Sequence, residues 1–248
     1  MLGQQPGFSG TVHDIKTGLG INPVYSSLHD PPIEEAIWDL IIGRVLTIES
    51  KGNFGWDHLR VTDFGAEVVR EQRWSPYDPD GYLKELASQA PGATRLCGLY
   101  VEEALRCFRG GSYLATAVML GAASEGVVLN LFKSLLDAMK ANRGMPEVSG
   151  YESNLNRAHS VFEKHKEFKK YFEPIRVRLP GNLNDDLDLQ LDGVFNLIRY
   201  YRNSSGHPTG TQVERMAAYT SLVLFVPYCK RVEDVGNWLI SHAEELNQ

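Results

Sequence analysis

The stretch SYLATAVMLGAASEGVVLNLFKSLLDAMKAN, Ser112 to Asn142, decides the fold of this chain. Its apolar residues recur three or four positions apart, which is the period of one face of an α-helix. They are Leu114, Val118, Val128, Phe132, Leu135 and Met139, with Gly121 in the same row. No proline interrupts the stretch. The pattern therefore predicts one long helix, the longest in the protein.

Glu125 lies in the middle of this apolar face and is the single charged residue between Gly111 and Phe132. That segment is long enough to cross a bilayer. It also contains serine, threonine and asparagine, and no basic flank sets a membrane topology. We therefore expect the central helix of a soluble bundle. A carboxylate buried there needs a cation, and a second helix must supply it because the next cation on this helix is Lys133.

The rest of the chain after Tyr82 is helical in pattern. Further helices are expected within 99–111, 152–172, 185–203, from Thr211 to 226, and within 232–248. Thr211 and Glu214 fit a capping box, which places a helix start at Thr211. Long helices joined by short turns imply an antiparallel bundle over residues 82–248. The fold class is thus mainly α, preceded by a small α/β module.

The N-terminal region has a different composition. Residues 1–30 are rich in glycine, serine and proline and predict an irregular extension. Residues 31–75 predict a helix, two short strands (LTIES and HLRVT) and a second helix with Asp63 as its N-cap. This order resembles a winged-helix module. Its first helix carries acids that would repel DNA phosphates. The sequence therefore favours a docking or dimer-forming role over DNA binding. Residues 76–81 are expected to form a linker.

Composition narrows the function further. The formal net charge of −6 argues against a protein that coats nucleic acid non-specifically. The three cysteines have no metal-ligand spacing, and the start of the chain has no signal-peptide pattern. We expect a cytoplasmic protein with reduced thiols and without a cofactor, a bound metal or a membrane partner.

The stretch RYYRNSSGHPTG, Arg199 to Gly210, holds the candidate site. Arg202 continues the apolar row of Leu187, Leu191, Val194 and Ile198, so it is expected to face the bundle and pair with Glu125. A guanidinium can pair with a carboxylate and keep donors for an incoming anion. His207 precedes the expected helix start at Thr211, where a phosphate would be stabilised. The alternative is a partly buried ion pair without chemistry.

The segment Arg202-Asn203-Ser204-Ser205-Gly206-His207 resembles the Arg–polar–three residues–His signature of HEPN domains. YLATAVMLGAASE is similar to the HEPN helix that carries small residues and an acid, and the resemblance covers roughly Leu96 to Phe225. It implies a dimeric helical bundle in which two motifs line one cleft that takes RNA or a nucleotide. In many such domains the RNA 2′-hydroxyl attacks the adjacent phosphate without a metal. His207 would then be the acid–base group and Arg202 would stabilise the phosphate charge. Asn203 would orient the phosphate or the histidine, and Glu125 would hold Arg202.

Other members of that family bind nucleotides or proteins without cleaving, and some toxins act with a cognate antitoxin or regulator. A non-catalytic module is therefore the second interpretation, and a winged-helix DNA-binding regulator is the third. One basic region could hold RNA: residues 157–178 contain seven Lys/Arg against three Asp/Glu, with aromatic residues between them. The candidate contacts are Lys166, Lys169, Lys170, Arg176 and Arg178. The alternative is a solvated helix face with internal ion pairs and buried aromatics.

Overall fold

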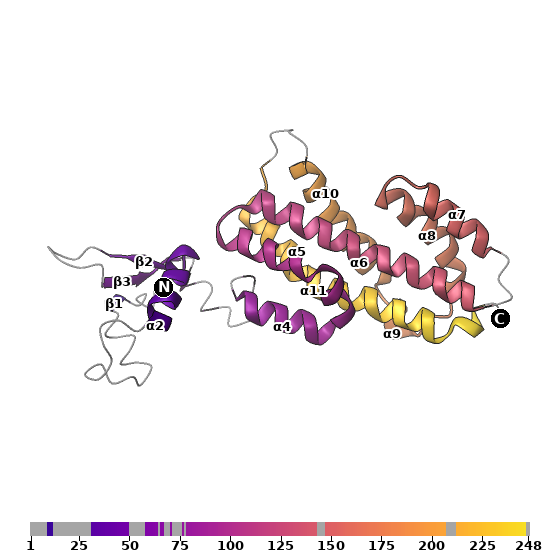
Figure 1. Cartoon of the computed structure of the whole chain (residues 1–248), viewed down its shortest axis with the longest axis horizontal. Coiled ribbons are helices and arrows are strands. Elements are labelled where there is room, and N and C mark those ends of the chain that lie inside the picture. The colour runs from indigo at the N-terminus through magenta and orange to yellow at the C-terminus, as the bar shows by residue number, and fades with distance from the viewer. Residues whose placement is uncertain are drawn as a thin grey trace, which may run out of the picture. The chain divides into compact units, whose positions relative to one another are not determined.

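The computed structural model describes residues 9–11, 31–49, 58–63, 65–66, 70, 76, 78–142, 147–206 and 212–246 (Figure 1). The chain divides into two compact units. The first comprises Met1–Tyr77 with Arg109–Gly111, and the second comprises Asp78–Phe108 with Ser112–Gln248. Each unit is described by itself below.

In its described residues the first unit contains helix α2, a three-stranded antiparallel sheet and further helical residues within 63–70. Helix α2 spans Pro31–Ile42, and the strands are β1 (Ser9–Thr11), β2 (Leu46–Ile48) and β3 (His58–Val61), in the order β1-β3-β2. The core of the unit consists of Ile37, Leu46 and Leu59. The predicted helix and hairpin are confirmed. The expectation that residues 1–30 are wholly irregular is wrong, because Ser9–Thr11 pairs with β3. Backbone pairing forms this strand, and SGT has no apolar period to reveal it.

Thr62 rather than Asp63 caps the turn that follows β3. The amide N–H of Gly65 donates to Oγ1 of Thr62 at 2.8 Å, and Asp63 is already helical. The Thr62 hydroxyl also donates to the carbonyl oxygen of Arg44 at 2.6 Å. A Cβ at position 65 would lie 2.2 Å from the carbonyl oxygen of Val45. A glycine is therefore required where this turn passes the end of β2.

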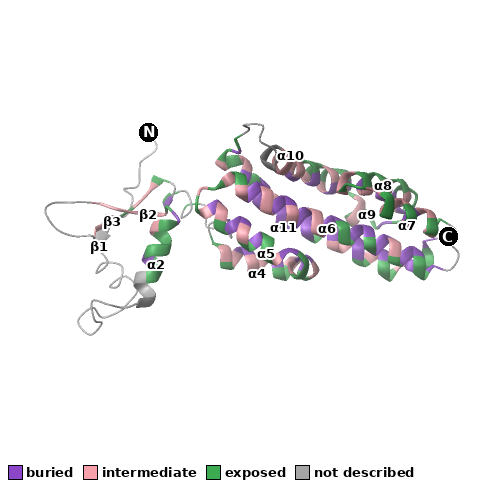
Figure 2. Cartoon of the chain, turned by 45° about the horizontal axis from the view of Figure 1, so that its top comes forward, coloured by how far each residue is buried: buried purple, intermediate pink, exposed green. Residues whose placement is uncertain are grey.

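The second unit is the predicted antiparallel helical bundle. Its helices are α4 (Pro79–Gln89), α5 (Pro91–Arg109), α6 (Tyr113–Ala141), α7 (Val148–Arg157), α8 (Val161–Arg176), α9 (Gly181–Asn184), the π-helix η1 (Leu189–Gly193), α10 (Val194–Gly206), α11 (Arg215–Ser241) and the 3₁₀ turn η2 (Ala243–Glu245). Helix α6 packs against both α10 and α11, and buried residues recur along it from Thr116 to Met139 (Figure 2).

Helix α6 also meets the length and hydropathy criteria of a membrane span, and half of its most apolar window is buried within the protein. Val128, Phe132, Leu135 and Met139 of the predicted face are buried, whereas Leu114 is 47% exposed. The apolar face therefore begins about one turn later than the sequence pattern indicated. The helix occupies the centre of the bundle, as expected.

Several predicted boundaries in this unit are wrong. The helix end predicted at residue 226 is one of them, because α11 runs through Pro227 to Ser241. Residues 76–81 are not all linker, because Asp78 caps α4 by accepting a hydrogen bond from the Gly81 amide at 2.9 Å. The helix expected to end at Asn203 continues to Gly206 as α10. Helix α11 begins at Arg215, with Glu214 at its N-cap and no side-chain capping bond, so the predicted helix start at Thr211 is wrong. Thr211 itself lies outside the described residues.

Candidate functional site

The candidate site is built on the facing sides of α6 and α10. Nη2 of Arg202 lies 3.5 Å from Oε1 of Glu125, so the predicted ion pair is confirmed. The Arg202 side chain is 40% exposed and that of Glu125 is 26% exposed. The pair thus lies at the edge of the bundle, where water or a ligand can reach the guanidinium. Solvent at such a position weakens the attraction relative to a fully buried pair.

Gly121 makes the close approach of Arg202 possible. It is buried one helical turn before Glu125 on α6. A Cβ at position 121 would lie 2.4 Å from Cβ and 2.3 Å from Cγ of Arg202. Since those atoms are fixed near the backbone of α10, the absence of a side chain at Gly121 admits the stem of Arg202. The sequence pattern placed Gly121 on the apolar face but did not reveal this contact.

Asn203 provides a second partner for the same guanidinium. Nη1 of Arg202 donates to Oδ1 of Asn203 at 3.1 Å. Two of the guanidinium nitrogens are therefore held by oxygens, one from each of two helices. His207 lies outside the described residues, and its position relative to Arg202 stays a prediction.

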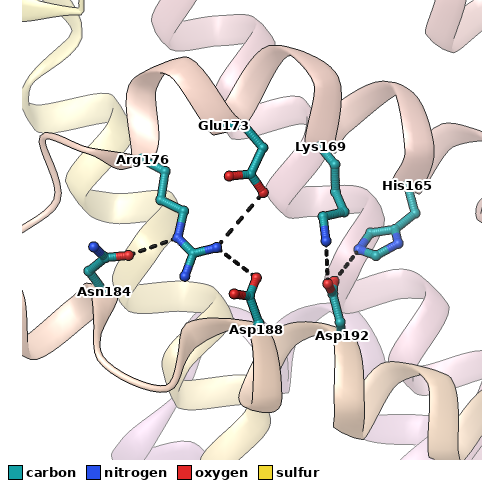
Figure 3. Close-up of polar contacts among 7 residues, drawn as sticks. All are labelled: His165, Lys169, Glu173, Arg176, Asn184, Asp188 and Asp192. Atoms are coloured by element: carbon teal, nitrogen blue, oxygen red, sulfur yellow. Dashed lines mark hydrogen bonds and ion pairs between the residues drawn. The ribbon is translucent and has the colours of Figure 1, made fainter.

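The basic region of α8 makes a different set of contacts (Figure 3). Asp192 of η1 accepts hydrogen bonds from Lys169 and from Nε2 of His165, the latter at 3.1 Å. Nη1 of Arg176 donates to Asp188 at 2.6 Å, and its Nε donates to Oδ1 of Asn184 at 2.8 Å. Two of the five candidate RNA contacts are therefore already paired with carboxylates: Lys169 with Asp192 and Arg176 with Asp188.

These contacts change the ionisation of the groups involved. The hydrogen bond from His165, with that from Lys169, lowers the pKa of Asp192 even though burial opposes it. The hydrogen bond to Asp192 in turn raises the pKa of Lys169. Both shifts favour the charged forms, because each charged group is stabilised by its partner. The cluster acts as an ionic clamp between α8 and η1.

The aromatic residues of α8 are largely turned into the core. Phe168 and Phe172 are buried, and Phe168 packs on Phe132 with their ring centroids 5.0 Å apart. Neither ring is accessible for stacking on a base. The ammonium of Lys166 lies 4.6 Å from the centroid of Phe162. For most of this region the contacts agree with the solvated-face alternative rather than with a nucleic-acid groove.

The described part of the chain contains no group of three His, Cys, Asp or Glu residues placed to hold a metal ion. Cys97 and Cys229 are buried thiols, and Cys107 is half-buried. Burial raises the pKa of Cys97 to about 12 and raises that of Cys229 as well. Both are therefore packing residues at neutral pH.

Comparison of the chain with protein-family models, with curated proteins and with solved structures finds no match.

Proposed function

We propose that the helical bundle is an RNA-binding domain of HEPN type that cleaves RNA without a metal ion. The observation that carries the proposal is the arrangement of Arg202. Its guanidinium is held by Glu125 and Asn203, yet 40% of the side chain remains exposed. A held but accessible guanidinium suits a phosphate group, because few rotamers must be frozen when the anion binds.

The chemistry follows from the residues near the end of α10. One His207 imidazole accepts the proton of the RNA 2′-hydroxyl, and the resulting oxygen attacks the adjacent phosphorus. A second imidazole, from the other subunit of a homodimer, protonates the 5′-oxygen as its bond to phosphorus breaks. Arg202 stabilises the extra negative charge that develops on the phosphoryl oxygens. The products are a 2′,3′-cyclic phosphate and a free 5′-hydroxyl end.

The second candidate is a non-catalytic protein-interaction module of the same fold in the cytoplasm. The ion pairs of Lys169 and Arg176 favour it, because they reduce the positive surface that could follow an RNA backbone. In that case Arg202 and Glu125 only join α10 to α6. The two candidates differ in whether RNA is bound at all.

The test is incubation of the purified protein with end-labelled single-stranded RNA in EDTA. We expect cyclic-phosphate ends, a loss of activity in His207→Ala, and a decrease of about 10² to 10³ in rate in Arg202→Gln. Arg199→Gln is the matched control, because Arg199 lies on the same helix and contacts the Phe162 ring instead.

Each outcome separates the candidates. Cleavage that survives Arg202→Gln would contradict the assigned site. Binding without cleavage, lost in Arg202→Gln, would keep the RNA site and remove the enzymatic step. Absence of both binding and cleavage would favour the interaction module, and duplex DNA binding that requires residues 31–75 would favour the regulator.

A further inference from the structure

A cavity of about 360 Å³ is lined by residues from α6, α8 and the segment after η2. Figure 1 shows the ends of α6 and α11 near the C-terminal end of the bundle. The apolar part of its lining comprises Tyr171, Pro174 and Ile175 of α8, with Met139 at the end of α6 and Leu246 after η2. Met139, Ile175 and Leu246 are only 1%, 3% and 3% exposed. Tyr171 is half-buried and Pro174 is exposed, so these two residues offer most of the accessible apolar surface. Segments far apart in the sequence thus build one hollow, and its volume falls in the range of small-molecule sites.

The rim of the cavity is polar and mainly cationic. The described residues that line it include the cations Lys170 and Arg178 and the acid Glu147. In the described part of the chain Lys170 has no ion pair, and its ammonium lies 5.4 Å from the centroid of the Tyr171 ring. Nη1 of Arg178 donates to the carbonyl oxygen of Glu245. Within the described lining, two cations therefore stand beside one acid and an aromatic ring.

Pro174 removes one backbone hydrogen bond of α8. It lies within α8 and has no N–H to donate to the carbonyl oxygen of Lys170, four residues earlier. Both residues line the cavity.

We propose that this cavity binds a small organic anion that has a flat apolar body and one carboxylate, sulfonate or phosphate group. The body would lie on Tyr171 and Pro174, and the anionic group would meet Lys170 and Arg178. Met139 follows Glu125 by 14 residues on α6, a rise of about 21 Å. The cavity is thus separate from the Arg202 site, and the inference does not depend on the proposed function.

The experiment uses two fluorescent probes with the same aromatic body. One is 8-anilinonaphthalene-1-sulfonate, which carries the anionic group, and the other is the uncharged N-phenyl-1-naphthylamine. The protein is expected to bind the sulfonate at one saturable site per chain. The Lys170→Gln variant should weaken sulfonate binding about five- to tenfold, because one charge-assisted contact is removed, and should leave the uncharged probe unaffected.

Lys164→Gln is the matched control, because Lys164 lies on the same helix and does not line the cavity. Arg178→Gln tests the second cation, with the circular dichroism spectrum checked because Arg178 also holds the C-terminal segment. Equal weakening by Lys164→Gln and Lys170→Gln would overturn the proposal. So would unchanged sulfonate affinity in Lys170→Gln, or loss of both probes to the same extent.

Discussion

Replacement of Gly121 by alanine tests the packing that positions Arg202. The new methyl group would lie 2.3 Å from Cγ and 2.4 Å from Cβ of Arg202, whereas carbon atoms in contact are about 3.5 to 4 Å apart. Helices α6 and α10 would have to separate by about 1 Å, or Arg202 would have to leave its rotamer. Overpacking of this kind costs about 1 to 3 kcal/mol, which outweighs the roughly 1 kcal/mol that alanine gains over glycine in a helix.

Gly126→Ala provides a control of opposite sign on the same helix. A Cβ at Gly126 would have no neighbour within 4 Å, so only the helix propensity changes, and we expect a gain of about 0.5 to 1 kcal/mol. The assay is urea unfolding of the full chain followed by the helical circular dichroism signal. With a slope of about 2 to 3 kcal/mol per molar, the two midpoints should move in opposite directions.

The same pair of variants also reports on the site. If Gly121→Ala displaces Arg202 from Glu125, RNA cleavage should fall in that variant and persist in Gly126→Ala. A Gly121→Ala protein as stable as the wild type would refute the packing argument. Full activity in that variant would refute the assigned role of the contact, whatever its stability.

Three further predictions concern the ionic clamp and the thiols. Asp192→Asn removes the carboxylate that binds His165 and Lys169. Because the Asp192 side chain is only 24% exposed, we expect the free energy of unfolding to fall by about 2 kcal/mol. The control variant Asp188→Asn, at a side chain 63% exposed, should lower it by less than about 1 kcal/mol. The stabilisation from Asp192 should be complete above its ordinary pKa of 3.8 and disappear as the pH falls through the lower pKa of the folded state. The difference in stability between the wild type and Asp192→Asn should therefore persist down to about pH 5 and disappear in stronger acid. A stability difference already lost at about pH 5 would contradict this. A thiol reagent at about pH 8 should modify Cys107 well before the buried Cys97 and Cys229, and equal reaction of all three thiols would show that the core is open.

The sequence by itself determined the mainly helical bundle, the central position of residues 113–141 and the hairpin of the N-terminal module. These features follow from the period of apolar residues and from turn residues, which act over a few neighbouring positions. The Arg202–Glu125 pair was also predictable, because an acid on an apolar face requires a cation from another helix. The end of α10 at Gly206 and the start of α11 at Arg215 were not predictable from the sequence. Alternative capping residues near a helix end differ by only about 1 kcal/mol in the stability they give.

Only the tertiary structure decided which charged groups are already satisfied. The sequence shows seven cations within residues 157–178, but it does not show that Asp188 and Asp192 of a different segment lie against two of them. It likewise could not place Leu246 beside Met139 and Ile175 in one cavity, or the stem of Arg202 over Gly121. Such contacts depend on the relative depth and rotation of whole helices, which are set by the packing of the entire core and leave no local pattern in the chain.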